Sequence, residues 1–157
     1  ASDVYKRQAV KGLQSGQIQF LYAPTHLNPT YEYGVTFERG TAVTYGDRKQ
    51  IFISGTASID NQGEIMYPGD ILKQTERMLE NIDTLLQEAG SGLQDIMQAI
   101  VYLRDPADYV VVKQYIESRY PSFLHLIVHA PVCRPGWLIE TECIAVIPAD
   151  APQYAYL

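Results

Sequence analysis

Two glutamates, Glu140 and Glu142, stand in a stretch whose composition predicts a β-strand over residues 137–147. Side chains alternate between the two faces of a strand, so both carboxyl groups share the face that continues into Ile144 and Val146. On an apolar face, burial disfavours the charged form of a carboxyl group and raises its pKa, which suits a general acid or base. The alternative is an exposed strand end with both glutamates solvated, and the role of Glu142 stays open.

An arginine and a cysteine precede this pair. Arg134 lies six residues before Glu140, and a guanidinium can hold a carboxylate through two parallel hydrogen bonds, which suits an acidic metabolite. The alternative for Arg134 is a solvated side chain in a turn. Cys133 is expected to line a pocket or to be a small buried residue, because a reactive thiolate would need a nearby cation and only Arg134 is at hand. Arg104 and Arg119 are expected on surfaces or helix ends.

Earlier in the chain, Ser54 and Arg39 are further candidates for ligand binding. The Ser54-Gly55-Thr56 triplet offers hydroxyl and backbone N–H groups; the alternative is a bulge or strand end that needs the glycine. Ser54 has no His/Asp partner at a recognisable spacing, so a hydrolase triad is not supported. Arg39 is a second candidate for binding a carboxylate, or else a solvated charge beside a loop.

The clearest element is a helix that begins at Asp70 and closes at Gly90. Asp70 can cap the first turn. Between the two residues apolar side chains recur every three or four positions, so they form one apolar stripe that a sheet must cover. A second helix is predicted from Asp105-Pro106 to Tyr120, where Pro121 stops it. Two helices suffice to cover one face of a single sheet.

Six segments predict strands, at residues 17–22, 37–45, 50–58, 96–103, 124–132 and 137–147. The second and third flank a polar turn and predict a hairpin, and the last two are expected to pair across Arg134-Pro135-Gly136. The order predicts an α+β fold with a single mixed β-sheet and two helices on one face. The other face still carries apolar residues, so we expect a homo-oligomer.

Length and composition fit one packed domain, with 157 residues of which 46% are hydrophobic and 19% charged. Residues 1–8 resemble translated adapter sequence and are expected to be a non-native leader, which would make the chain the tail of a longer product. Residues 9–32 are expected to form an N-terminal extension, 33–148 the domain and 149–157 a tail. No stretch approaches the roughly 20 apolar residues that cross a bilayer, so we expect a cytoplasmic protein without membrane association.

The cysteines and histidines predict neither a disulfide nor a metal site. Cys133 and Cys143 are too few for a disulfide scaffold, and in the expected hairpin they lie several residues apart along the ladder. The three histidines are too dispersed to bind zinc. We therefore expect no metal and no cofactor.

A set of motifs, in order along the chain, resembles the RidA/YjgF family, also named enamine/imine deaminases and L-PSP endoribonucleases. The motifs are 51–59 (IFISGTASI), Gly69-Asp-Ile-x-x-Gln74, Leu79-x-Asn81-Ile82, Ala89-Gly90, Asp95-Ile96, Val101-Tyr-Leu-x-Asp105 and 140–145 (ETECIA). The resemblance covers about residues 33–147. It implies a chorismate-mutase-like α+β fold and homotrimers with ligand clefts between subunits.

Within the family, the chain is similar to two enzyme branches. In the deaminase branch an Arg two residues before a Cys holds the substrate carboxylate; here the corresponding stretch is Ile127-Val128-His129, while Ser54 and Glu140 match. Residues 37–39, 54–59 and 132–140 resemble the C-terminal domain of chorismatases. Those enzymes hydrolyse chorismate to pyruvate and a dihydroxy or hydroxybenzoate product.

The chorismatase resemblance implies a small-molecule hydrolase in which Glu140 protonates the substrate. It implies that Arg134 and Arg39 hold the substrate's carboxylates, and that the cleft is lined by Ser54, Phe37 and Cys133. Two alternatives remain open. One is deamination of 2-imino acids, with Glu140 orienting the water, and the other is a module that binds metabolites or partners without turnover.

We predict that the chain does not bind RNA or DNA appreciably at physiological salt. Its 12 Lys and Arg stand against 18 Asp and Glu, which gives a net charge of −6 that phosphate backbones repel. Fluorescence anisotropy with labelled RNA and DNA checks this. Sub-micromolar binding that weakens steeply with added salt would reveal a basic patch that the composition hides.

Overall fold

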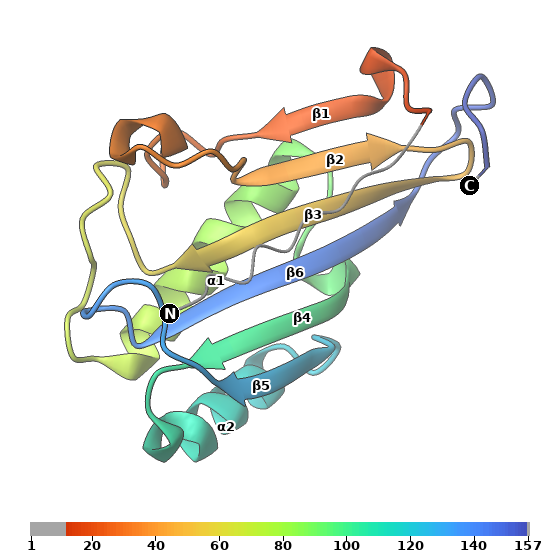
Figure 1. Ribbon diagram of the computed structural model, residues 1–157. Helices are drawn as coiled ribbons and strands as arrows, with labels where there is room; N and C mark the ends of the chain where they lie inside the picture. Colours follow the sequence, from red (N-terminus) through yellow and green to blue (C-terminus); the bar gives the residue numbers. More distant parts are fainter. Residues whose placement is uncertain (1–11, 157) are drawn as a thin grey trace.

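The computed structural model describes residues 12–156, so the expected leader at residues 1–8 lies outside them. One six-stranded sheet forms a layer, and both α-helices pack against one of its faces (Figure 1). The strands are β1 (Ile18–Leu21), β2 (Gly40–Thr44), β3 (Arg48–Ala57), β4 (Ile96–Leu103), β5 (His125–His129) and β6 (Ile139–Pro148). The helices are α1 (Ile71–Glu88) and α2 (Tyr109–Arg119). This is the α+β architecture that the sequence predicts.

The order of strands in the sheet is β1-β2-β3-β6-β4-β5. All neighbours are antiparallel except β4 and β5, which are parallel. The predicted hairpin is confirmed in β2 and β3, whose ladder closes at the Thr44–Lys49 pair. The last strand of the chain, β6, lies in the middle of the sheet and is paired with β3 on one edge and with β4 on the other.

Helix α1 forms the main contact of the helical layer. Asp70 caps it by accepting a hydrogen bond from the backbone N–H of Lys73, and Gly90 follows it at a φ of +80°, a left-handed conformation that favours glycine. Its apolar stripe is buried against the sheet at Met78, Leu79, Ile82, Leu85 and Leu86. Each such side chain stabilises the fold by roughly 1.5–3 kcal/mol.

The prediction that residues 124–132 pair with residues 137–147 is wrong. β5 instead pairs with β4 in parallel, after the crossover through α2, and residues 130–138 carry the chain back to β6, between β3 and β4. The physical reason is burial. Alternate residues of β6 are almost completely buried from Ile139 to Ala145, as a central strand requires, whereas Leu126 of β5 is exposed at the edge.

The two cysteines lie in different elements of this topology. Cys143 is buried opposite Ile53 and Ala99 rather than opposite Val128, and burial raises the pKa of its thiol to about 12. Cys133 is exposed in the connection between β5 and β6. Neither Cys133 nor Cys143 forms a disulfide, as predicted.

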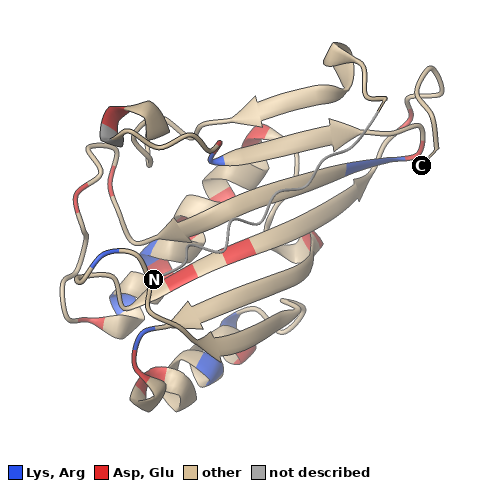
Figure 2. Ribbon diagram, viewed as in Figure 1, with Lys and Arg blue, Asp and Glu red and all other residues tan. Residues whose placement is uncertain are grey.

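The face of the sheet turned away from the helices is called the open face here; it faces the viewer in Figure 1, with α1 visible behind the strands. Glu140 and Glu142 lie on it, because their neighbours Ile139, Thr141 and Cys143 are buried on the helical side. The same face carries half-buried or exposed apolar side chains at Phe20, Phe52, Ile100, Leu126, Ile144 and Val146. Figure 2 shows two acidic segments along β6 in the middle of this face.

Neither α-helix within residues 12–156 is long and apolar enough to pass through a lipid bilayer.

Candidate functional site

A β-bulge opens the sheet beside the two glutamates. The ladder between β3 and β6 is regular up to Ile53 and resumes at Thr56, so Ser54 and Gly55 together stand opposite the single residue Glu142. A bulge bends its strand and redirects side chains locally. The Ser-Gly-Thr triplet is thus a bulge that needs its glycine, the alternative that the sequence left open.

Hydrogen bonds from Ser54 fix the bulge against the segment before β2. The Ser54 hydroxyl donates to the carbonyl oxygen of Glu38 at 2.7 Å, and the backbone N–H of Ser54 donates to the carbonyl oxygen of Arg39 at 3.0 Å. The Thr56 hydroxyl donates back to the Ser54 carbonyl at 2.9 Å. The bulge is therefore held on both sides.

The carboxyl group of Glu140 lies directly over Gly55. A Cβ atom added to Gly55 would stand 2.1 Å from Oε1 of Glu140, a separation that two such atoms cannot adopt. Only glycine leaves room for the carboxyl group at this place. Bulge and glycine together therefore make the space that Glu140 occupies.

Burial and two neighbouring residues set the acidity of Glu140. Burial raises its pKa, the negative charge of Glu142 raises it further, and a hydrogen bond from the backbone N–H of Cys133 opposes both effects. Tyr102 of β4 stands directly across from Glu140 on the same face. The result is a half-buried carboxyl group that holds its proton more firmly than a solvated glutamate does.

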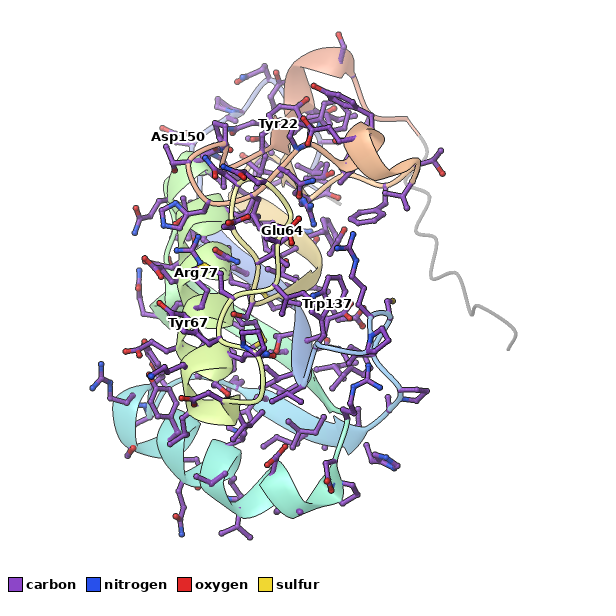
Figure 3. All side chains as sticks on the ribbon, turned by 90° about the vertical axis from the view of Figure 1, so that its left-hand side faces the viewer. Tyr22, Glu64, Tyr67, Arg77, Trp137 and Asp150 are labelled. Atoms are coloured by element: carbon purple, nitrogen blue, oxygen red, sulfur yellow. The ribbon has the colours of Figure 1, made fainter. Side chains whose placement is uncertain are left out.

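The connection of residues 130–138, called the β5–β6 loop here, carries both other residues predicted near Glu140. Cys133 is exposed and contributes its N–H to the Glu140 carboxyl group. Arg134 donates a hydrogen bond to the carbonyl of Gly63 at 3.2 Å, and its guanidinium carbon lies 5.2 Å from the centre of the Trp137 ring. Figure 3 shows Trp137 away from the helical layer, which is marked by Arg77 and Tyr67.

Arg39 is only 4% exposed, and its side chain donates to the backbone and side-chain oxygens of Asn28 at 2.9–3.2 Å. Its guanidinium carbon also lies 5.8 Å from the ring centre of Phe37, which is 38% exposed. These contacts show that Arg39 ties the preceding loop to the start of β2. Its role in binding a carboxylate stays a prediction, as does the role of Phe37.

Two residues that sequence reasoning did not place at the site hold the β5–β6 loop. Arg104 was expected on the surface or at a helix end, but its guanidinium donates to three carbonyl groups of the loop. Gln74 of α1 is completely buried, and its amide contacts the loop at Gly136 and Leu138. Gln74 belongs to the Gly69–Gln74 motif, which was the available signal; nothing in the sequence singled out Arg104.

Two surface hollows within residues 12–156 lie away from this site. One of about 440 Å³ lies on the helical layer, lined by residues of α1 and by Tyr67 and Tyr120. A smaller one of about 220 Å³ lies between Tyr109 of α2 and Ile127 of β5. Glu140 lies half-buried on the open face. Within residues 12–156, no cluster of His, Cys, Asp and Glu is placed to hold a metal ion.

Sequence comparisons connect the chain to known proteins. The model of the family described as Endoribonuclease L-PSP matches residues 40–147. A RutC family protein of Pyrococcus abyssi is 35% identical over 97 residues, which cover 60% of this chain and 76% of the relative. The 3-aminoacrylate deaminase RutC of Acinetobacter baylyi is 30% identical over 97 residues, which cover 60% of this chain and 77% of the relative.

Solved structures share the fold. A chorismatase superposes with a TM-score of 0.72 at 23% identity, over 82% of this chain and 43% of its own, so this chain spans less than half of that enzyme. RidA from an Antarctic Psychrobacter bacterium superposes with a TM-score of 0.67 at 23% identity, over 82% of this chain and 99% of its own. Both likenesses confirm the single mixed sheet with two helices.

We predict that Gly55→Ala destabilises the protein by about 1–2 kcal/mol, because the added methyl group overlaps the Glu140 carboxyl group. In a Glu140→Ala background the same change should cost markedly less, and a double-mutant cycle of unfolding free energies measures the difference. Gly92→Ala is the matched control, since its Cβ would meet the flexible end of Gln94 at 2.6 Å. Equal costs of Gly55→Ala in both backgrounds would contradict the close approach.

We predict that Glu140→Gln stabilises the protein at pH 7 more than at pH 4. The folded pKa of Glu140 is raised, so its favourable contribution is complete only below the unfolded pKa, about 4.3, and is lost as pH rises through the folded pKa. The glutamine cannot ionise and avoids that loss. Thermal unfolding across this pH range tests the effect, and Glu64→Gln, at an exposed position, provides the control. A stabilisation by Glu140→Gln that does not depend on pH would refute the raised pKa.

Proposed function

Because the chain belongs to the Endoribonuclease L-PSP family, the RidA/YjgF superfamily, we propose that it hydrolyses a small unsaturated carboxylate that carries oxygen or nitrogen on its double bond. Glu140 is the general acid of this reaction. The first candidate substrate is chorismate or a close analogue, an enol ether. The reaction needs water and a proton donor, and we propose no cofactor.

The observation that carries the proposal is the setting of Glu140. Its half-buried carboxyl group, with a pKa raised by burial and by Glu142, remains protonated at a higher pH than a solvated glutamate. A general acid works best when its pKa lies near the working pH. The space over Gly55 keeps the group at a fixed place on the open face.

For an enol ether, the reaction begins when Glu140 gives its proton to the terminal methylene carbon. The electrons of the carbon–carbon double bond form the new C–H bond, and the neighbouring carbon becomes an oxocarbenium ion. Water adds to that carbon and returns a proton to the Glu140 carboxylate. The hemiketal then collapses: its bond to the ether oxygen breaks, the proton of its hydroxyl group is transferred to that oxygen, and pyruvate and an alcohol leave.

Positive side chains near the site would hold the substrate's carboxylates. Arg134 lies in the loop that contacts Glu140, and its guanidinium has the fork geometry that binds a carboxylate with two hydrogen bonds. Arg39 lies behind the Ser54 bulge, where its buried charge would favour an anion. The Ser54 and Cys133 side chains and Phe37 are proposed to line the cleft.

Deamination of an enamine is the second candidate, and the named RutC relative favours it. 3-Aminoacrylate is also an electron-rich unsaturated carboxylate, so the same acid would protonate the carbon next to its carboxylate. Water would add to the resulting iminium carbon, and the adduct would release ammonia and an aldehyde. The stretch Ile127-Val128-His129 lacks the arginine of the deaminase branch, which is why the enol ether is placed first.

A second copy of the chain is proposed to close the site. Members of this family are commonly oligomers that bind small molecules, and the open face presents apolar side chains around Glu140 that a partner would cover. We propose a homotrimer with the clefts between subunits. Light scattering should give the mass of a trimer at micromolar concentration; a stable monomer would leave the site open to water and contradict this arrangement.

We predict that Glu140→Gln lowers kcat by at least about 100-fold, the usual contribution of a general acid, while the protein stays folded. Glu142→Gln is the matched control: it lies on the same face, and we expect it to change kcat by less than about tenfold. Release of pyruvate from chorismate and of ammonia from 3-aminoacrylate or 2-iminobutanoate distinguishes the two candidates.

Equal losses in the two variants would contradict the special role of Glu140. If the wild-type protein releases neither pyruvate nor ammonia, the hydrolase proposal is wrong for these substrates, and a module that binds metabolites without turnover becomes the better account.

A further inference from the structure

We infer that Arg104 is a positioning residue, which holds the β5–β6 loop so that the backbone N–H of Cys133 stays hydrogen-bonded to the Glu140 carboxyl group. The inference rests on the proposed role of Glu140 as the acid. It assigns Arg104, which directly follows β4, to the control of that acid without any contact with the substrate.

Arg104 anchors the loop at three places. Its Nε donates to the carbonyl oxygen of Trp137 at 2.6 Å, and its Nη2 donates to those of Val132 at 2.8 Å and Arg134 at 2.6 Å. The three carbonyls flank Cys133 on both sides. A single planar guanidinium therefore fixes the backbone on either side of the N–H that reaches Glu140.

Arginine suits this task and lysine does not. The guanidinium presents five N–H donors in a rigid plane, so it can serve several carbonyl groups at once with little loss of rotamer freedom per bond. An ammonium group is compact and has no such fork. Arg104→Lys would keep the positive charge and much of the side-chain stem but would release most of the loop carbonyls.

Other contacts hold the far end of the loop, so Arg104 governs a short segment rather than the whole connection. Gln74 of α1 donates to the Gly136 carbonyl at 3.0 Å and accepts the N–H of Leu138 at 3.0 Å. The backbone N–H of Arg104 itself donates to the Leu138 carbonyl at 3.0 Å. Loss of the Arg104 side chain should therefore loosen residues 132–134 while the start of β6 remains in place.

The loosened segment acts on Glu140 through one hydrogen bond. The Cys133 N–H lowers the pKa of Glu140, so releasing it leaves burial and Glu142 unopposed and raises that pKa further. Tyr102 of β4, which faces Glu140, and the uncharged Ser54 and Gly55 of β3 lie outside the loosened segment. Arg134 lies within it, but its guanidinium keeps a separate hydrogen bond to the carbonyl of Gly63. The direction of the shift is therefore fixed by the geometry.

The test is a titration of the glutamate side-chain carboxyl carbons by NMR, without substrate, in the wild-type protein and in Arg104→Lys and Arg104→Gln. Both variants should move the Glu140 midpoint to higher pH. Arg77→Lys is the matched control, since Arg77 also donates to two backbone carbonyls, those of Ile59 and His26, but does so on the helical layer. It should leave the Glu140 midpoint unchanged.

Three results overturn the inference in folded variants. A shift in Arg104→Gln but not in Arg104→Lys would show that the charge acts directly, and an equal shift in Arg77→Lys would show that general loosening is the cause. A midpoint unmoved in all variants is equally contrary. Because no substrate is present, a failure of the proposed hydrolysis leaves this test intact, and a shifted midpoint without any change of turnover would count against the hydrolysis alone.

Hydrogen exchange of the Cys133 amide tests the same bond, first in the wild-type protein and then in Arg104→Lys. The Cys133 amide belongs to an exposed residue, and we expect its exchange to be slowed by its bond to Glu140 and to accelerate roughly fivefold or more in Arg104→Lys. Exchange of this amide at the rate of an unprotected peptide in the wild type would overturn the inference even if the variants do not fold.

Discussion

The site depends on one close approach, that of the Glu140 carboxyl group to the backbone at Gly55. The approach requires a residue without a side chain, and it requires the β3 strand to bulge at Ser54 so that the carboxyl group fits beside the sheet. Both requirements are met in one tripeptide. The same approach takes the carboxyl group out of water, which raises its pKa and gives it the acidity that the proposed reaction uses.

The rest of the fold keeps this carboxyl group in place from three directions. β6 fixes its backbone in the middle of the sheet, β4 presents Tyr102 opposite it, and the β5–β6 loop supplies the N–H of Cys133. That loop is held in turn by hydrogen bonds from Arg104 and from the buried amide of Gln74. Because Gln74 belongs to α1, the helical layer contacts the loop that reaches the open face.

Local patterns in the sequence predicted what depends on neighbours along the chain. The cap at Asp70 and the shared face of Glu140 and Glu142 follow from helical and strand periodicity, and both are confirmed. Which strands lie side by side is a different question, because periodicity identifies a strand but not its partner, and so the pairing of β5 was missed. The role of Arg104 was missed for the same reason, since its carbonyl partners are about 30 residues away in the sequence.

A titration of the Glu140 carboxyl carbon in the wild-type protein and in Glu142→Gln tests the central claim most directly. The account predicts a midpoint above the ordinary glutamate value of about 4.3 in the wild type, and a lower midpoint once the charge of Glu142 is removed. A wild-type midpoint at or below the ordinary value would contradict the account, because Glu140 would then be ionised at neutral pH, like a solvated glutamate, and could not act as a general acid.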